Sequence, residues 1–454
     1  MSFQVINPAT GETVKEIPVW DNASVEAALS QVAAATPGWA GRPIAERCEL
    51  MRKAAQVLRD NKEKYAQIIT TEMGKLIKDA RAEVEKCASV CDYYAEHGPE
   101  FLKDETLASD ASHSFVAYLP LGTVLAVMPW NFPFWQVFRF AAPALVAGNT
   151  GLLKHASNVP ESALAIEEVF QQAGFPAGTF RTLMIRASQV QKVIEDSRVH
   201  AVTLTGSEPA GRQVAATAGA NIKKSVLELG GSDAFIVLED ADLDEAARVA
   251  VTSRYLNTGQ SCIAAKRFIV VDAIAEDFVA RFKAGAEALQ PGDPMNEATT
   301  LAPMARNDLR DELHQQVTDS IAAGAVAVTG CQPGEGKGAY YLPSILDRVE
   351  PGMRAYGEEL FGPVAIVIRA RDEDDAIRIA NDSPFGLGGS IWTRDTQRGE
   401  RLARQMQSGA TFVNGLVKSD PRLPFGGIKN SGYGRELSHH GIHEFVNAKT
   451  IWIK

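Results

Sequence analysis

The feature that most constrains the fold is an alternation, through the middle of the chain, of short apolar runs with stretches of helical periodicity. Residues 122–128, 150–154 and 201–205 are apolar runs of strand length, and residues 162–172 repeat apolar positions at helical spacing. Continuous apolar runs are typical of strands that are buried on both faces, and their alternation with helices favours a parallel sheet. The sequence therefore predicts an α/β fold with a doubly wound sheet.

The pattern restarts after Glu228-Leu-Gly-Gly231, which predicts a second α/β domain. Its expected strands lie at 235–237, 268–271, 325–328, 364–369, 388–392 and 411–413, and its expected helices at 243–256, 274–289, 309–323, 374–381 and 398–406. The first hundred residues instead show helical spacing, for example at 24–35 and 44–58. A length of 454 residues with 45% hydrophobic content supplies large cores, enough for about three domains.

Two segments with alternating polarity, 112–119 and 445–453, fit neither domain. Their period of two predicts antiparallel strands, and a small projecting sheet made from them would have exposed edges. A second subunit would cover such edges, so we expect a homodimer or homotetramer. The expected division is a Rossmann-like cofactor domain, a catalytic α/β domain and an antiparallel oligomerisation element, at 1–110 with 121–229, at 230–430, and at 111–120 with 431–454.

Charge and cysteine content restrict the partners and the compartment. The net charge of −10 disfavours nucleic acid and anionic membranes. No stretch approaches the roughly 20 apolar residues of a membrane span, and the first residues lack a secretory signal pattern, so a cytoplasmic protein is expected. The 5 cysteines are too few for a disulfide framework. Cys87 and Cys91 stand near His97 without a second ligand pair, so core packing is favoured and no metal is expected.

Two glycine-containing segments are candidates for binding a phosphate group. Residues 334–339 come nearest to the dinucleotide fingerprint, but aromatic residues follow where a helix should begin, so a hairpin loop is the favoured interpretation. Thr205-Gly206-Ser207 instead ends an apolar run and begins a helix. Gly206 permits a close approach, and Ser207 lies where the positive end of the helix faces an anion.

Three polar residues are candidates for catalysis. Cys262 follows Asn257-Thr-Gly-Gln-Ser and is predicted to be an exposed nucleophile with a lowered pKa, although an inert buried thiol is the alternative. Glu228 ends an apolar strand before two glycines, which predicts a raised pKa suited to a general base; a salt-bridged carboxylate is the alternative. Asn131 lies at the carboxyl edge of the first strand, where its amide donates to an oxyanion or forms a local Asx-turn.

The motifs of the chain together resemble those of the aldehyde dehydrogenase superfamily. The likeness runs from Ile6 to Thr450 and is carried by seven segments. These are Pro-Trp-Asn-Phe-Pro (129–133), Leu-Leu-Lys (152–154), Thr-Gly-Ser (205–207), Leu-Glu-Leu-Gly-Gly (227–231), Gly-Gln-Ser-Cys (259–262), Glu-Glu-Leu-Phe-Gly-Pro (358–363) and Pro-Phe-Gly-Gly-Ile-Lys (424–429). The resemblance implies an NAD(P)-dependent oxidoreductase and disfavours two other classes, a cysteine hydrolase and a catalytically silent structural protein.

The resemblance also implies a mechanism that agrees with the roles expected from the residues. Cys262 attacks the aldehyde, and Asn131 with the Cys262 backbone amide holds the oxyanion. Hydride then passes to nicotinamide, which leaves a thioester on the cysteine. Water activated by Glu228 hydrolyses the thioester and releases a carboxylic acid.

Cofactor contacts follow from the same resemblance. It places Lys154 on the adenosine ribose, Ser207 on the pyrophosphate, and Glu359 and Phe361 on the nicotinamide ribose and ring. NAD-preferring relatives often carry a glutamate three residues after the lysine, where this chain has Ser157. Because Ser157 cannot repel a 2′-phosphate and Lys154 can pair with it, we expect NADP or NAD as the cofactor, with the use of NADP favoured by Ser157. The full expected set is Met128, Pro129, Trp130, Lys154, Ser157, Gly206, Ser207, Leu229, Glu359 and Phe361.

The expected substrate is a short aldehyde with a terminal carboxylate. Arg139 lies in the aromatic segment 134–140, and its guanidinium suits a carboxylate at the far end of the substrate; a structural salt bridge is the alternative. With Trp135 and Ser419 it resembles the substrate site of the succinate-semialdehyde dehydrogenase branch. The branch often adds an arginine where this chain has Leu256, so glutarate semialdehyde and medium-chain aldehydes remain alternative substrates.

A second departure concerns redox regulation. Many members of the branch carry a further cysteine two residues after the nucleophile, where this chain has Ala264. A disulfide between neighbouring site cysteines is therefore not available to the chain.

Overall fold

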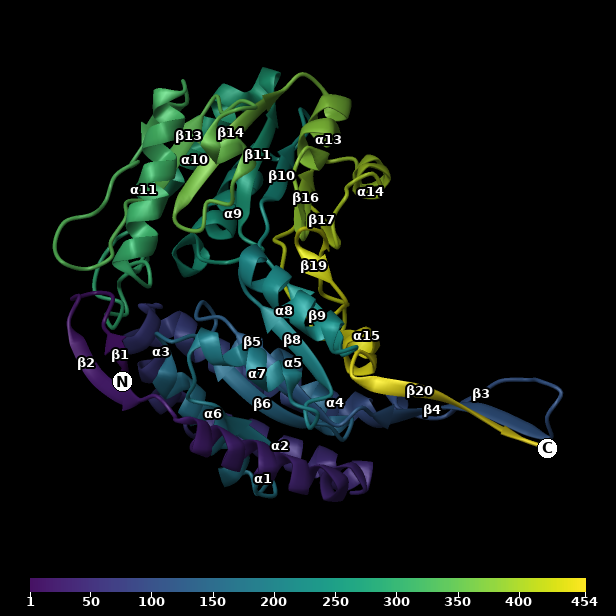
Figure 1. The fold of residues 1–454 in the computed structure, drawn as a ribbon. Helices are drawn as coiled ribbons and strands as arrows, with labels where there is room; N and C mark the ends of the chain where they lie inside the picture. Colours follow the sequence, from purple (N-terminus) through teal and green to yellow (C-terminus); the bar gives the residue numbers. More distant parts are fainter.

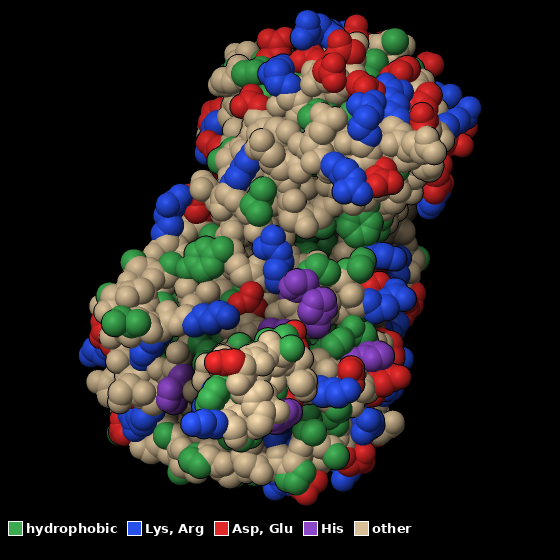
Figure 2. Space-filling model, turned by 90° about the vertical axis from the view of Figure 1, so that its right-hand side faces the viewer, with side chains coloured by type: hydrophobic (Ala, Val, Ile, Leu, Met, Phe, Trp, Pro, Cys, Tyr) green, Lys and Arg blue, Asp and Glu red, His purple; other side chains and the backbone are tan.

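The computed structural model describes all 454 residues and contains two large sheets that lie one above the other, with a narrow three-stranded sheet projecting to one side (Figure 1). Figure 2 views the molecule from the end of that projection and shows an upper and a lower lobe, over which acidic and basic side chains are interspersed. None of the helices is both long and apolar enough to cross a membrane. The observed architecture confirms the predicted α/β class.

The lower sheet contains the first set of predicted strands. Five of its strands run parallel, and one short antiparallel strand is added at one edge. In spatial order they are β19 (Gly432–Tyr433), β9 (Lys224–Glu228), β8 (Ala201–Thr205), β5 (Thr123–Met128), β6 (Thr150–His155) and β7 (Phe180–Thr182). The edge strand β7 has only 3 residues.

Both faces of the lower sheet are covered by helices, which explains why its strands read as continuous apolar runs. Val124 and Ala126 of β5 pack into one core, whereas Leu125 packs into the core on the opposite face. The helices are α1 (Asn22–Ala40), α2 (Ile44–Asp60), α3 (Lys62–Met73), α4 (Ile77–Phe101), α5 (Trp135–Val146), α6 (Pro160–Gln172), α7 (Val190–Glu195) and α8 (Glu208–Ala220).

The upper sheet has seven strands, all parallel except an antiparallel edge strand. In spatial order they are β12 (Val326–Thr329), β13 (Ser344–Asp347), β14 (Val364–Ala370), β11 (Ala265–Val271), β10 (Asp233–Val237), β16 (Gly388–Trp392) and β17 (Ala410–Val413). Its helices are α9 (Leu243–Tyr255), α10 (Asp272–Glu287), α11 (Asn307–Ala322), α12 (Arg354–Gly357), α13 (Glu373–Asn381) and α14 (Thr396–Ala403). The sequence patterns missed β13, a fully buried strand of only 4 residues.

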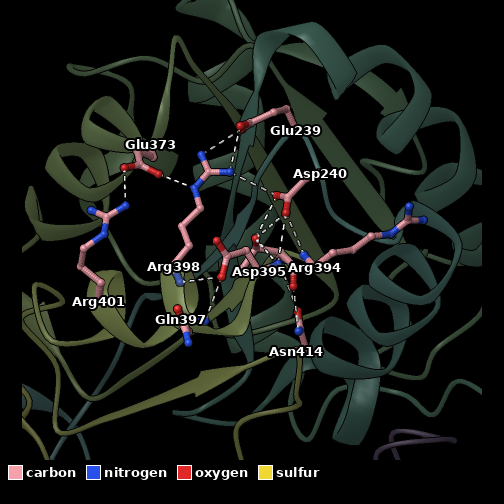
Figure 3. A network of polar contacts seen from close by, with 10 residues as sticks. Glu239, Asp240, Glu373, Arg394, Asp395, Gln397, Arg398, Arg401 and Asn414 are labelled. Atoms are coloured by element: carbon pink, nitrogen blue, oxygen red, sulfur yellow. Dashed lines mark hydrogen bonds and ion pairs between the residues drawn. The ribbon is translucent and has the colours of Figure 1, made fainter.

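A network of charged side chains ties together the loops at the carboxyl ends of β10 and β16 (Figure 3). Arg398 donates to Glu239 (2.8 Å) and pairs with Glu373. The Asp240 carboxylate accepts from the Thr393 hydroxyl (2.8 Å) and from the Arg394 backbone amide (3.0 Å). These contacts join three separate segments, 239–240, 373 and 393–398, at the end of the upper sheet that faces away from the lower one (Figure 1).

The projecting sheet consists of β20 (Val446–Ile453), β4 (His113–Pro120) and β3 (Glu105–Thr106). β20 pairs with β4 in antiparallel register over its whole length, which confirms the predicted pairing of these two segments. Leu119, Trp452 and Ile453 are 41%, 49% and 48% exposed. The sheet order leaves one edge of β20 unpaired, so an oligomer that covers it stays a prediction.

The remaining short elements complete the chain. An antiparallel hairpin opens it, and a small antiparallel pair and a last helix lie near its end. They are β1 (Ser2–Ile6), β2 (Thr13–Pro18), β15 (Phe385–Gly386), β18 (Ile428–Lys429) and α15 (Ser438–His443). The predicted division into functional domains stays a prediction, and the structure adds that residues 432–433, from the segment 431–454, extend the lower sheet beside Glu228.

Candidate active site

The candidate site lies where the carboxyl ends of the lower sheet meet the amino ends of the upper one. β5 ends at Met128, just before Asn131, β8 ends just before Gly206, and β9 ends at Glu228. Cys262 comes from the other side, in the loop that precedes β11. The arrangement agrees with the rule that parallel α/β sheets bind ligands beyond the carboxyl ends of their strands, but only for the lower sheet.

The loop before Cys262 has an unusual backbone. Asn257 and Thr258 adopt left-handed conformations, with φ of 54° and 56°, and Gly259 follows with φ of 72°. A Cβ at Gly259 would lie 2.2 Å from the carbonyl oxygen of Gly362, so only glycine fits there. Strained backbone of this kind persists where the surrounding structure fixes it, which is typical of functional loops.

Two buried cations fix the loop. Arg254 is 0% exposed and donates to the carbonyl oxygens of Gly259 (2.6 Å) and Gly362 (2.8 Å). Lys266 donates to the carbonyl oxygen of Cys262 (2.7 Å) and pairs with Glu359 (3.0 Å). Neither residue was predicted as part of the site, although a charged residue inside an apolar strand or helix face is a signal that could have identified it.

Asn131 is held against the cysteine loop. Its side chain is 4% exposed, and its amide donates to the carbonyl oxygen of Gln260 (3.1 Å). Asn257 in turn donates to the carbonyl oxygen of Asn131 (2.9 Å). The Asn131 amide therefore bonds across the border between the sheets and not within its own turn, which favours the oxyanion interpretation over the Asx-turn.

Cys262 is half-buried as a residue and lines two cavities. Burial raises its pKa to about 12, although the nearby cations Lys266 and Arg139 act in the opposite direction. The sequence pattern had predicted a lowered pKa for this thiol. The difference arises because desolvation outweighs the two cations in the protein without ligands, so forming the thiolate requires a further positive charge or a base.

Glu228 is 2% exposed, and neither of its carboxyl oxygens has a hydrogen-bond partner. Burial, followed by the neighbouring charge of Glu436, raises its pKa well above the usual value, as a general base requires. Its Oε1 lies beside Gly426, where a Cβ would approach to 2.7 Å. Glu228 itself lines neither cavity, whereas the next residues, Leu229 and Gly230, line the second one.

The first cavity, which we call the aldehyde pocket, has a volume of about 120 Å³. The predicted substrate residues Trp135, Arg139 and Ser419 all line it together with Cys262. Arg139, however, forms a buried ion pair with Glu436, and its guanidinium lies 4.5 Å from the ring centre of Phe425. The structure thus shows the salt bridge that was the alternative interpretation of Arg139, in a residue that also faces the pocket.

One cation of the aldehyde pocket was not predicted from the sequence. Lys86 of α4 lines the pocket, donates to the Ser419 hydroxyl (2.7 Å) and lies 4.1 Å from the ring centre of Trp135. Nothing in the residues around Lys86 signals this role, because α4 is far from Cys262 in the sequence. Only the packing of α4 against α5 brings the lysine to the site.

α4 also fixes the start of α5. Glu83 accepts from the backbone amides of Phe134 (2.9 Å) and Trp135 (3.0 Å), so a buried carboxylate satisfies the first free N–H groups of α5. Lys75 pairs with Glu83 and neutralises it. The pair thereby orients both Trp135 and the preceding loop that carries Asn131.

The second cavity, which we call the cofactor pocket, has a volume of about 250 Å³. Its aromatic walls are Trp130 and Phe361, whose ring centres lie 5.8 Å apart at 89°. Gly206 and Ser207 line it at the start of α8, where the Ser207 side chain makes no capping bond. The free N–H groups of this first turn suit a pyrophosphate, and the aromatic walls suit a flat ring. The residues present therefore fit a dinucleotide.

The predicted cofactor residues divide into those that line this pocket and those that do not. Pro129, Trp130, Gly206, Ser207, Leu229, Glu359 and Phe361 line it. Met128 is buried beneath it at the end of β5. Lys154 and Ser157 lie outside the lining, at the end of the neighbouring strand β6, where Lys154 is buried without an ion pair and Ser157 is exposed.

Two other sequence interpretations are confirmed outside the site. Residues 334–339 form a loop closed by a bridge between Pro333 and Tyr341, with no helix after it. Cys87 and Cys91 are 0% exposed and belong to the hydrophobic core under the lower sheet.

Comparison with known proteins gives consistent results. The model of the aldehyde dehydrogenase family matches residues 1–451. The chain is 51% identical to succinate semialdehyde dehydrogenase (NAD(P)+) Sad of Escherichia coli, over 98% of this chain and 97% of that protein. It is 50% identical to succinate-semialdehyde dehydrogenase (NADP(+)) 1 of Mycobacterium ulcerans, over 100% of both. A crystal structure of succinic semialdehyde dehydrogenase from Streptococcus pyogenes in complex with NADP+ superposes with a TM-score of 0.97 at 39% identity, over 99% of both chains.

Proposed function

Because the chain belongs to the aldehyde dehydrogenase family, we propose that it oxidises succinate semialdehyde to succinate with NADP as the preferred electron acceptor. One observation carries the proposal: Cys262 lies between the cofactor pocket, which fits a dinucleotide, and the aldehyde pocket, which has an excess of positive charge. Arg139 and Lys86 both line the aldehyde pocket, and only Arg139 has a carboxylate partner. A short aldehyde with an anionic tail suits such a pocket.

In the first chemical step Cys262 loses its thiol proton to water, its sulfur bonds to the carbonyl carbon, and the carbon–oxygen π bond breaks. The carbonyl oxygen then carries the developing negative charge, and the second N–H of the Asn131 amide donates to it. Lys266 holds the backbone of Cys262 in place through the carbonyl oxygen, so the sulfur is oriented before the aldehyde arrives. The product of this step is a thiohemiacetal on Cys262.

Trp130, Ser207, Glu359 and Phe361 would hold the dinucleotide, with Ser207 and the first turn of α8 at the pyrophosphate. When bound, the oxidised nicotinamide supplies a positive charge near the thiol and accepts the hydride that leaves the substrate carbon. Lys266 fixes Glu359 on the rim of this pocket through their ion pair. The cysteine is left carrying a thioester.

Glu228 acts in the second half of the reaction, the hydrolysis of the thioester. Its carboxylate takes a proton from water, the water oxygen bonds to the acyl carbon, and the carbon–sulfur bond breaks to release succinate and the Cys262 thiolate. Because Glu228 lines neither pocket, its side chain must rotate toward Cys262 for this step. Both carboxyl oxygens lack hydrogen bonds, so no bond has to break for the rotation.

The preference for NADP rests on the end of β6. Lys154 has no carboxylate partner, and Ser157 three residues later is neutral and exposed. A 2′-phosphate on the adenosine ribose therefore meets a cation and no repelling charge.

A panel of aldehydes against both cofactors tests the function. We expect the highest kcat/KM for succinate semialdehyde with NADP, a lower value for glutarate semialdehyde and much lower values for uncharged aldehydes. A broad preference for medium-chain uncharged aldehydes would instead favour the second candidate, a general aldehyde dehydrogenase.

We also propose that the protein is a homo-oligomer, located in the cytoplasm. The exposed apolar residues and the unpaired edge of the projecting sheet support the homo-oligomer. The five free cysteines support the cytoplasmic location. Light scattering of the intact chain and of a chain truncated after Phe445, which lacks β20, tests the assembly. An unchanged native-size particle in the truncated chain would contradict it.

A further inference from the structure

The amine of Lys266 lies between the cysteine loop and the cofactor pocket. Lys266 is 1% exposed, and its amine donates to the carbonyl oxygens of Ser261 (2.7 Å) and Cys262 (2.7 Å). The same amine pairs with a carboxyl oxygen of Glu359 at 3.0 Å. A lysine amine has three donors, so these acceptors use all of them. One buried charge is therefore shared between the backbone that carries the nucleophile and a carboxylate on the wall of the cofactor pocket.

Glu359 contacts the loops that follow both kinds of strand at the border. Its side chain is half-buried and lines the cofactor pocket. It accepts from the backbone amide of Gly231 at 3.2 Å, and it packs so closely on Gly230 that a Cβ there would collide with the carboxylate. A carboxylate has about four acceptor positions, so Glu359 can accept from ligand hydroxyls while it keeps Lys266. A hydroxyl donor in the pocket thus reaches a charge that already acts on the cysteine loop.

A second buried carboxylate, which the mechanism does not use, lies near the same amine. Asp233 begins β10, is 3% exposed and has no cation within the 4.0 Å ion-pair distance. Its Oδ1 accepts from the Gly388 backbone amide (3.0 Å), whereas its Oδ2 has no hydrogen-bond partner. Burial raises the pKa of Asp233 to about 6, and the charge of Lys266 is the largest influence that opposes the rise. At neutral pH the Asp233 carboxylate is charged and acts on Lys266 through space.

We propose that Lys266 is a positioning residue that couples the occupancy of the cofactor pocket to the reactivity of Cys262, with Glu359 as the contact to the ligand and Asp233 as an opposing charge. The inference rests on the proposed function, because it needs a dinucleotide in that pocket, and deepens it. Ribose hydroxyls that donate to Glu359 draw part of its negative charge away from Lys266. More of the lysine charge then acts on the loop that carries the sulfur, which favours the thiolate.

The charges around the Cys262 thiol act on it with opposite signs. Burial is the largest influence and raises the pKa of the thiol; Lys266 and Arg139 lower it, and Glu359 and Asp233 raise it. Removing the charge of Lys266 should therefore make the thiol less reactive, and removing the charge of Asp233 should make it more reactive. Side chains that only held the loop in place would lower the reactivity in both variants.

The central experiment measures the alkylation of Cys262 by iodoacetamide, which needs no turnover. The other four cysteines are buried, and mass spectrometry of the modified peptide verifies the site. At about pH 8, Lys266→Met should slow alkylation about 10-fold, the effect of a rise of about one unit in the thiol pKa. Lys266→Arg should restore most of the rate. Asp233→Asn should accelerate alkylation about two-fold to five-fold.

Asp233→Asn keeps the shape of the side chain and all three bonds of Lys266, so it tests the sign of the effect even if Lys266→Met does not fold. Slower alkylation in Asp233→Asn would overturn the proposal. Lys418→Met is the matched control, because Lys418 is exposed at the rim of the aldehyde pocket and its charge is solvated. A loss in Lys418→Met as large as that in Lys266→Met would show a general field effect and would contradict the proposal.

The compound 2′-phospho-ADP-ribose tests the coupling, because it contains the second ribose but lacks the nicotinamide ring and its charge. Saturation with this probe should accelerate alkylation of the unaltered protein about three-fold to ten-fold. In Lys266→Met the acceleration should disappear, while calorimetric titration still shows binding of the probe. An acceleration of the same size in this variant would contradict the coupling. Loss of probe binding would also contradict it, because Lys266 would then shape the pocket itself.

Two outcomes keep this inference separate from the proposed function. If the unaltered protein does not bind the probe, the dinucleotide pocket fails, and the proposed function fails with it. If the unaltered protein binds the probe and oxidises succinate semialdehyde, but alkylation is no faster with the probe than without it, only the coupling through Lys266 fails.

Discussion

The two parallel sheets differ in which ends of their strands face the border between them. In the lower sheet the carboxyl ends of β5, β8 and β9 face it, and they carry Asn131, Gly206 and Glu228. In the upper sheet the amino ends face it, and Cys262 precedes β11. The carboxyl ends of the upper sheet point away and are closed by the ion pairs around Arg398 (Figure 3). One sheet therefore uses its carboxyl ends for chemistry, and the other uses them to join its loops.

The difference shows the limit of a topological rule. Free N–H groups at helix starts and the exposed loops that follow strands make carboxyl ends good ligand sites. In the upper sheet the same end instead carries acidic loops that pair with arginine, while buried Arg254 and Lys266 stabilise an irregular loop at the opposite end. A charged group at a strand end therefore belongs either to a ligand site or to an ion pair that stabilises loops, and only its partners distinguish the two cases.

The largest effect on activity is expected when the Cys262 sulfur at the border between the two sheets is replaced. Cys262→Ser should reduce kcat by a factor of about 10⁴ or more, because the hydroxyl is a far weaker nucleophile in the absence of an adjacent base. The thermal midpoint should stay within a few degrees, since the loop is held by its backbone contacts to Arg254 and Lys266. Activity with saturating NADP and differential scanning calorimetry measure the two effects. Substantial residual dehydrogenase activity would place the nucleophile elsewhere.

The next largest effect concerns the lower sheet. Glu228→Gln should slow hydrolysis of the thioester by about 10²-fold to 10⁴-fold, the usual contribution of a general base. Reduced cofactor should then appear in a burst of about one equivalent per site, followed by slow turnover. If the slow turnover has no burst of reduced cofactor, Glu228 acts in the first half of the mechanism instead. Stopped-flow absorbance of the reduced cofactor distinguishes the two outcomes.

The raised pKa of Glu228 adds a dependence on pH. Burial disfavours the carboxylate, so this form appears only as pH rises through a pKa well above the usual range. Because the base acts as the carboxylate, the rate of hydrolysis should rise with pH across that range and fall on acidification. This rise of the hydrolysis rate with pH should be absent in Glu228→Gln.

Much of this arrangement was predictable from local patterns, and the exceptions share a physical cause. Apolar runs identified β5, β6 and β8, because strands covered on both faces need apolar residues at every position. Asn131, Glu228 and Cys262 stood out because each is a polar residue next to glycine, proline or a strand end.

Lys86 and the Arg139–Glu436 pair could not be found in this way. Each depends on segments that are distant in the sequence, namely α4 against α5 and α5 against residues that follow β19. The pKa of Cys262 was also misjudged, because desolvation is a property of the assembled pocket and not of the loop sequence.

A smaller effect is expected where the lower sheet binds the adenosine end of the cofactor. Ser157→Glu adds a carboxylate near the end of β6, which repels a 2′-phosphate and accepts from ribose hydroxyls. The ratio of kcat/KM for NADP over NAD should fall by about 10-fold to 100-fold, the range for a gained or lost charged hydrogen bond. Ser157→Gln, of similar size and without charge, is the control and should change the ratio less. An unaffected ratio would locate the 2′-phosphate site away from Ser157.

The smallest effect on activity is expected at the far end of the upper sheet. Arg398→Met removes the cation shared by Glu239, Asp240 and Glu373, so three carboxylates that now face one guanidinium would repel one another. Because the side chain is 18% exposed and solvent screens the charges in part, the free energy of unfolding should fall by only about 1 kcal/mol. kcat and KM should stay within about two-fold, since the network lies at the end of the sheet opposite to Cys262. Urea denaturation and steady-state kinetics on the same preparation measure both. A large loss of kcat without loss of stability would mean that the two ends of the upper sheet are coupled, and the division between chemistry at one end and stability at the other would fail.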